Sequence, residues 1–209
     1  MNKDLENVSA HIKELGIGLM SQAQKNGFFW NPDNYLDEGV FGVLQAAQAA
    51  EIFIKAAIAE QHPLLIFSNL PTSKQANGEL LNIEHLFEKG KTVQYSELPE
   101  LLWASTGYKL PNLDIYRNFG NLRNCVQHLA VPGNRDFPEE IAKFIYQVID
   151  PMIRHFWGLY AIDYIDQTDM DLEFMHVLRS MDIEFEYPQN KNELVEEAKS
   201  TWNSVLTGD

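Results

Sequence analysis

The chain has 209 residues, of which 45% are hydrophobic and 22% are charged, so it is long enough to bury one sizeable core. Sixteen basic residues against thirty acidic ones give a formal net charge of −14. This charge argues against a broad electrostatic footprint for duplex DNA or for an anionic membrane. Any contact with nucleic acid would have to be local.

The sequence also indicates the cellular compartment of the protein. The single cysteine, Cys125, excludes an internal disulfide and fits a reducing environment. The first ten residues lack the apolar segment of a secretory signal. No apolar run approaches the length of about 18–20 residues that spans a bilayer. We therefore expect a soluble, cytoplasmic protein.

Apolar residues at helical spacing predict an all-α chain. The first helix is expected over residues 4–25, and the second runs from Asp37 to His62, before Pro63. A short buried segment follows at 63–67, then a loop over 68–78, a helix over 80–87 that ends at Gly90, and a turn or two over 96–103. The inward faces of the first two helices are expected to be Leu5, Val8, Ile12, Leu15 and Leu19, and Val40, Leu44, Ala47, Ile54 and Ile58.

The second half of the chain predicts two more long helices. A central helix begins near Asn112 or Asp114 and stops at residues 130–133. Another begins at Asp136, with Pro138 near its first position and acidic residues in its first turn. Pro151 should kink this helix, because its ring removes one backbone hydrogen bond, and the helix should resume over 153–160.

The C-terminal part is strongly acidic. Over residues 163–209, twelve acidic minus three basic residues give −9 of the total −14. The pattern predicts a short helix over 172–181, an extended piece over 183–187 and a final helix over 193–206. We divide the chain into a helical domain at 1–165 and an acidic C-terminal helical extension at 166–209. We expect this extension to pack beside the core or to meet a basic partner.

The central helix has an unusual polar face. Its apolar stripe is Tyr116, Phe119, Leu122 and Val126, and its polar stripe is Arg117, Asn121, Asn124 and His128. The polar residues fall within about 60° of one another in helical projection. No carboxylate follows Asp114 on this helix, so the face favours an anion, and His128 can move a proton near neutral pH. The alternative is an ordinary solvated stripe.

Glu51 falls in the middle of the inward stripe of the second helix, where an unpaired carboxylate would be costly. It either bonds inside the bundle to Arg123 or Arg117, or lies at the edge of the stripe and bonds to Lys55 one turn later. The sequence leaves both alternatives open.

The pattern favours neither a metal nor a cofactor. Glu173 and His176 have the spacing of di-iron carboxylate ligands, but the chain has no second copy of that pair. No phosphate-binding or dinucleotide-binding glycine motif is present. Cys125 lies three residues before His128, and we interpret it as a small core residue rather than a nucleophile.

Arg123, Asn124 and His128 together resemble the signature of the HEPN superfamily, Arg-x(4–6)-His with Asn often following the Arg. The alanine-rich helix around Glu51 and Lys55 resembles an earlier helix of the same family. The similarity covers about residues 35–160. It implies an all-α, HEPN-like up-and-down helical bundle.

The resemblance also implies a function. HEPN proteins include metal-independent endoribonucleases, often toxins or phage-defence effectors, that act as homodimers. Here His128 would be the general base or acid, Arg123 would stabilise the phosphate and Asn124 would orient it. Glu51, Arg117, Asn121 and Gln127 would support them.

The homodimer would form through the Arg123–His128 helix, and we expect its RNA partner to be single-stranded rather than duplex. Toxins silenced by AMP transfer from a cognate antitoxin carry a Tyr two residues after the His. Ala130 occupies this position here, which argues against that route of control. Two alternatives stay open: a non-catalytic HEPN module that binds RNA, nucleotide or a protein partner, and an all-α scaffold.

Overall fold

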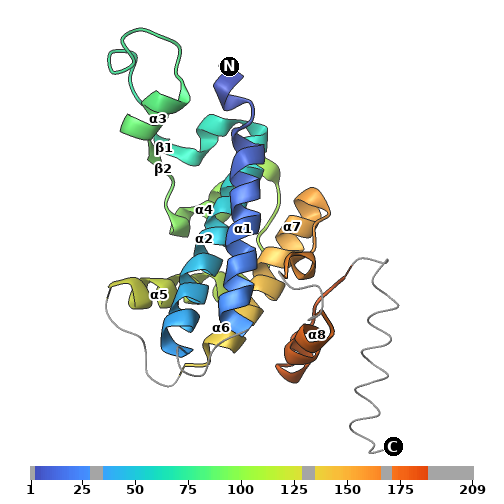
Figure 1. Cartoon of the computed structure of the whole chain (residues 1–209). Coiled ribbons are helices and arrows are strands. Elements are labelled where there is room, and N and C mark those ends of the chain that lie inside the picture. The colour runs from blue at the N-terminus through green and yellow to red at the C-terminus, as the bar shows by residue number, and fades with distance from the viewer. Residues whose placement is uncertain (1–2, 29–34, 129–134, 166–170, 188–209) are drawn as a thin grey trace, which may run out of the picture.

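The computed structural model describes residues 3–28, 35–128, 135–165 and 171–187. Within these ranges the regular secondary structure is helical apart from one two-stranded sheet, which confirms the all-α prediction (Figure 1). The elements of the first half are η1 (Lys3–Leu5), α1 (Val8–Phe28), α2 (Tyr35–Gln61), η2 (Pro63–Ile66), β1 (Phe67–Asn69), α3 (Ile83–Lys89), β2 (Lys91–Thr92), η3 (Tyr95–Glu97) and α4 (Leu98–Thr106). Those of the second half are α5 (Leu113–His128), α6 (Phe137–Phe144), η4 (Ile145–Ile149), α7 (Asp150–Trp157), η5 (Ala161–Tyr164) and α8 (Asp171–Ser180).

Helices α1 and α2 lie side by side and form the axis of the molecule (Figure 1). Gly16 permits their close approach, because a Cβ atom at this position would lie 2.9 Å from the Phe53 ring. The predicted inward face of α1 was therefore wrong in part: Leu15 is 50% exposed, and Met20 and Ala23 are buried instead. The close approach at Gly16 goes with a rotation of the helix that buries Gly16, Met20 and Ala23 rather than Leu15.

Helix α2 is the centre of the core and contacts α1, α4, α5 and α6. The predicted inward residues Ala47, Ile54 and Ile58 are buried, as are most of their neighbours. The stretch Gly39–Gln61 is long and apolar enough to cross a membrane by length and composition alone, contrary to the expectation that no such run exists. Its most apolar window is 67% buried inside the protein, as expected for a helix surrounded by others.

The sheet and α3 lie at the end of the molecule near the N-terminus (Figure 1). Strand β1 pairs antiparallel with β2, a pairing that the sequence did not predict because both strands are very short. Helix α3 starts after Asn82, whose side chain caps it, and ends at Gly90 as predicted. The predicted stop at 130–133 and the predicted final helix over 193–206 lie outside the described residues.

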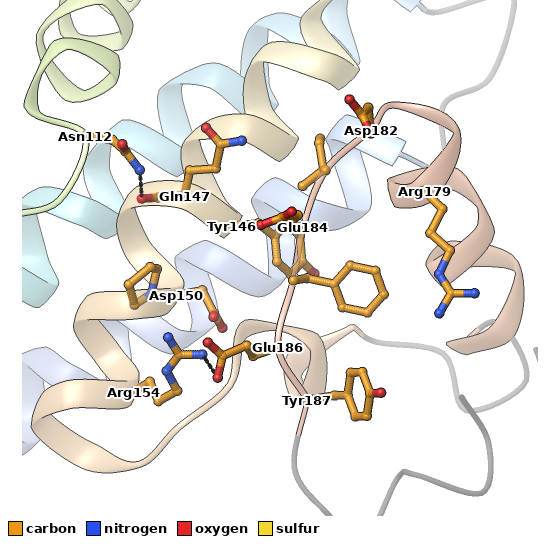
Figure 2. Close-up of a pocket in the computed structure, with 13 residues that line it drawn as sticks. Asn112, Tyr146, Gln147, Asp150, Arg154, Arg179, Asp182, Glu184, Glu186 and Tyr187 are labelled. Carbon is orange, nitrogen blue, oxygen red and sulfur yellow. Dashed lines mark hydrogen bonds and ion pairs between the residues drawn. The ribbon is translucent and has the colours of Figure 1, made fainter. Parts of the chain in front are cut away.

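The helix that contains Pro151 is irregular, as predicted, but the irregularity begins before the proline. A π-helical turn, η4, separates α6 from α7. Pro151 has no N–H, so the Gln147 carbonyl four residues earlier lacks its α-helical donor. The Asn112 side chain donates to that carbonyl at 2.9 Å (Figure 2). This bond joins the start of α5 to the distorted turn.

The described part of the acidic C-terminal region packs against the bundle. Met175, Leu178 and Ile183 are buried in the common core. Residues 183–187 form no strand, and Glu186 makes an ion pair with Arg154 of α7 (Figure 2). A hollow of about 890 Å³ lies between this segment and η4–α7.

Asp150 lies in this hollow with only 2% of its surface exposed. Its Oδ1 atom accepts a hydrogen bond of 2.7 Å from the backbone N–H of Ala161, which ties η5 to α7. Burial raises the pKa of the Asp150 carboxyl to about 6, although the Ala161 N–H and then Arg154 lower it. Ionised Asp150 therefore costs the folded state free energy at neutral pH.

Asp150→Asn should stabilise the protein at pH 7–8 by about 2–3 kcal/mol, because the amide oxygen can still accept from Ala161 and no charge is desolvated. The folded state binds the Asp150 proton more tightly than the unfolded state, so wild-type stability falls as pH rises from 3.8 to about 6. The difference between variant and wild type should vanish below pH 4. Thermal unfolding across this pH range measures the stability difference between variant and wild type. Asp182→Asn, at an exposed residue that lines the same hollow, is the control. A constant difference at every pH would contradict the prediction.

Candidate functional site

Helix α5 has the two faces that the sequence predicted. Tyr116, Phe119 and Leu122 are buried, and Phe119 stacks on Phe144 with ring centroids 3.9 Å apart. The predicted polar stripe is exposed: Arg117, Asn121, Asn124 and His128 all reach the surface. The buried aromatic face fixes the rotation of α5 and thereby the direction of its polar face.

A cleft of about 730 Å³ opens along this polar face, between α5 and the segment that leads from β2 through η3 into α4. We call it the arginine cleft. Of the predicted site residues, it brings together Glu51, Arg117, Asn121, Arg123 and Asn124. The facing side contributes Thr92, Val93, Gln94, Tyr95, Ser96, Pro99 and Glu100, and the remaining lining residues are Leu113, Tyr116 and Gly120.

The wall of the arginine cleft is a stack of two tyrosines and an arginine. The rings of Tyr95 and Tyr116 are 4.2 Å apart and nearly parallel, at 2°. Tyr116 Oη donates to the Tyr95 carbonyl at 2.8 Å, and Tyr95 Oη donates to the Tyr116 carbonyl at 3.4 Å. The Arg123 guanidinium carbon lies 5.0 Å from the Tyr95 ring centroid, a cation–π distance. The Arg123 guanidinium therefore packs over the Tyr95 ring.

Both tyrosines remain neutral hydrogen-bond donors. Burial is the main cause that raises the pKa of each phenol well above its usual range. The negative charge of Glu51 also raises both pKa values, whereas Arg123 lowers them. Neither tyrosine can act as an acid or base near neutral pH, so their contribution to the site is positional.

The charge of Arg123 is not neutralised by a carboxylate in the described part of the chain. Its Nη1 atom donates to Gln127 Oε1 at 3.5 Å. Its Nε atom is buried and has no hydrogen-bond acceptor among the described residues. Arg117 makes one exposed contact of 4.0 Å with Asp114, which screens it weakly. Arg123 thus keeps an unpaired charge in a cleft that Glu51 and Glu100 also line.

Glu51 bonds to Lys55, which decides between the two alternatives that the sequence left open. Lys55 Nζ donates to Glu51 Oε1 at 2.6 Å and to Thr92 Oγ1 at 3.2 Å. Pairing with Arg123 or Arg117 was the wrong alternative, although the Glu51 side chain is largely buried, at 19% exposure. The partner one turn away on the same helix is closer than any arginine of α5. Glu51 therefore forms no ion pair with Arg117 or Arg123 of the cleft.

Two predicted site residues, His128 and Gln127, do not line the cleft. His128 is exposed at the end of α5. Its imidazole forms no side-chain hydrogen bond with a described residue. Gln127 is also exposed and contacts the site only through Arg123. One copy of the described chain thus places the cations and amides together and leaves the imidazole outside.

Sequence reasoning missed Tyr95 and Gly120. A Cβ atom at Gly120 would lie 2.6 Å from Tyr95 Cε1, so only glycine leaves room for the ring that supports Arg123. A glycine on the face of α5 between Tyr116 and Asn124 was the one available signal. Tyr95 gave no signal, because its distance from α5 in sequence hides the contact.

The described residues contain no group of three or more His, Cys, Asp and Glu that could hold a metal ion. The side chains of Glu173 and His176 lie outside the described residues. Cys125 is a free, partly buried thiol.

Comparisons with protein-family models, with curated proteins and with solved structures find no match to this chain.

Gly120→Ala should displace the Tyr95 ring and loosen Arg123, with a loss of stability of about 1–3 kcal/mol, as expected for an overpacked site. Gly18→Ala is the matched control, because a Cβ atom there meets nothing within 4 Å. That substitution should stabilise the exposed helix by up to about 1 kcal/mol. Urea unfolding of both variants measures the two free energies. Equal effects of the two substitutions would contradict the proposed packing of Tyr95.

Proposed function

We propose that this protein is a metal-independent endoribonuclease of HEPN type that cleaves single-stranded RNA. It would act as a toxin or phage-defence effector. The observation that carries the proposal is the arginine cleft. In it, Arg123 stacks on Tyr95 without a carboxylate partner, next to the exposed Arg117 and the amides of Asn121 and Asn124. A phosphodiester can accept hydrogen bonds from such cations and amides, because Glu51, which also lines the cleft, is paired with Lys55 and no carboxylate of the described residues forms an ion pair with Arg123.

The chemistry needs no external reagent. A general base removes the proton of the ribose 2′-OH, and the oxygen attacks the adjacent phosphorus. The bond from phosphorus to the 5′ oxygen breaks, and a general acid protonates that leaving oxygen. The products are a 2′,3′-cyclic phosphate and a 5′-hydroxyl. Arg123 would stabilise the pentavalent phosphate, Asn124 would orient it, and His128 would move a proton.

The charge distribution favours a single strand over a duplex. Formal net charge is −14, so a long duplex would be repelled by most of the surface. The arginine cleft is a local exception with a volume of about 730 Å³, which suits one or two nucleotides. A flexible strand can enter such a cleft without approaching the acidic surface elsewhere.

A homodimer through α5 would complete the site. Within one copy, His128 lies outside the arginine cleft, and a single imidazole cannot serve as both acid and base at the same moment. Two copies related by a two-fold axis would supply two imidazoles and two sets of cations. The exposed polar stripe of α5 is the surface that would face the partner.

The second candidate is a non-catalytic module that binds RNA, nucleotide or a protein partner such as a cognate antitoxin. The exposure of His128 and its lack of a described hydrogen-bond partner favour this candidate. A catalytic imidazole is usually oriented by a second group. Binding without cleavage would distinguish the module from the nuclease.

His128→Ala and Arg123→Ala should each lower RNA cleavage by at least about 100-fold, because each removes a group that acts in the transition state. Cleavage by the wild type should be unaffected by EDTA. A gel assay with a mixed-sequence RNA measures the rates. His11→Ala, an exposed histidine on α1, is the matched control and should retain full activity. Undiminished cleavage by His128→Ala would exclude this mechanism.

The protein should be a dimer at micromolar concentration, and phosphate or a non-cleavable RNA should stabilise it because the anion offsets the repulsion between arginines. Light scattering with and without the anion measures the mass. Arg117→Glu should weaken the dimer in the presence of the anion, while Arg179→Glu, in the hollow beside α8, should not. A strict monomer under all these conditions would rule out an active site formed by two copies of the chain.

A further inference from the structure

A smaller hollow of about 360 Å³ adjoins the arginine cleft. It is lined by Pro99, Glu100, Trp103, Lys109, Leu110 and Leu113. Three of these residues, Pro99, Glu100 and Leu113, also line the arginine cleft, so the two spaces lie next to each other. The nucleotide next to a phosphate held by the arginines would lie near the hollow.

The hollow has an aromatic wall and an apolar floor. Trp103 is 50% exposed, whereas most large apolar side chains of the described chain are buried. Leu110 is buried, Leu113 is half-buried, and Pro99 is buried at the start of α4. Exposed tryptophan beside apolar side chains is a surface on which a flat, aromatic ligand can stack. A nucleobase has this shape and follows directly from the RNA proposal.

Two charged side chains lie at the rim of the hollow. Glu100 and Lys109 are both exposed and both belong to its lining. Lysine can contact the ribose–phosphate backbone. The carboxylate of Glu100 can only accept hydrogen bonds, so it selects a base edge that offers donors.

We propose that this hollow is a guanine subsite for the nucleotide next to the phosphate in the arginine cleft, an inference that rests on the proposed function. The base stacks on Trp103, and the Glu100 carboxylate accepts from the N1–H and N2–H groups of guanine. Guanine alone among the four bases presents two adjacent donors on its Watson–Crick edge. Adenine and cytosine place an acceptor beside their amino group, and uracil places carbonyls on both sides of its N3–H.

The test uses short oligoribonucleotides with 2′-O-methyl groups, which cannot be cleaved because the attacking hydroxyl is blocked. Titration calorimetry of the full-length protein compares a G-containing trinucleotide with the same sequence carrying U. The G-containing ligand should bind about 10-fold tighter or more, since a site built to pair donors rejects a base that lacks them. Glu100→Gln should reduce this preference to less than about 3-fold and leave the affinity for the U-containing ligand unchanged.

Trp103→Ala should weaken both ligands by about 10-fold, because the stacking contribution does not depend on the base. Phe87→Ala, which removes an aromatic residue that is 89% exposed on α3, is the matched control and should have no effect. Glu14→Gln on the exposed face of α1 serves as the control for the carboxylate. Circular dichroism of each variant establishes that its fold is retained.

The outcomes separate the two proposals. If Arg123→Ala weakens both ligands but Trp103→Ala and Glu100→Gln change neither affinity nor preference, the guanine subsite is wrong and the RNA cleft stands. If the wild type binds neither ligand, the proposed function fails and the subsite fails with it. A preference for G that survives Glu100→Gln would overturn the role of the carboxylate.

Discussion

The position of the arginine cleft depends on the contact between Tyr95 and α5. The Tyr95 ring packs against Gly120, stacks on Tyr116 and lies under the Arg123 guanidinium at cation–π distance. Because the two tyrosines also exchange hydrogen bonds with each other's carbonyl groups, η3 cannot move without moving α5. One aromatic contact therefore couples two segments that are distant in sequence and sets the orientation of the arginine.

The burial of α2 makes this arrangement rigid. The helix is surrounded by α1, α4, α5 and α6, and its alanines and Gly16 of α1 allow close packing. Lys55 and Glu51, the charged pair near the cleft, satisfy each other on this helix. Since neither needs an arginine of α5, the pair can be largely buried without cancelling the charge of the site.

Local charge compensation also explains how an acidic protein can hold an anion site. Among the described acids near α5, Glu51 bonds to Lys55 and Asp114 contacts Arg117 weakly at 4.0 Å, whereas Glu100 is exposed where the arginine cleft meets the smaller hollow. At distances beyond about 8–10 Å, surface charges are screened at physiological salt. The cleft is therefore governed by its nearest groups rather than by the net charge of −14.

The sequence by itself determined the helical class, the two faces of α5 and the grouping of Arg117, Asn121 and Asn124, because periodicity along one helix requires no knowledge of other elements. It also indicated the break near Pro151, since a missing N–H is a local property. These features were confirmed by the described structure.

Only the tertiary structure decided the partner of Glu51, the inward face of α1 and the role of Tyr95. Each depends on which residues of separate elements touch. Glu51 pairs with Lys55 rather than with an arginine because Lys55 lies one turn away on the same helix. Gly16 rather than Leu15 faces α2 because the close approach of two helices favours the smaller residue. Tyr95 contacts α5 across the intervening α4 segment, and no pattern in the sequence pairs it with Tyr116.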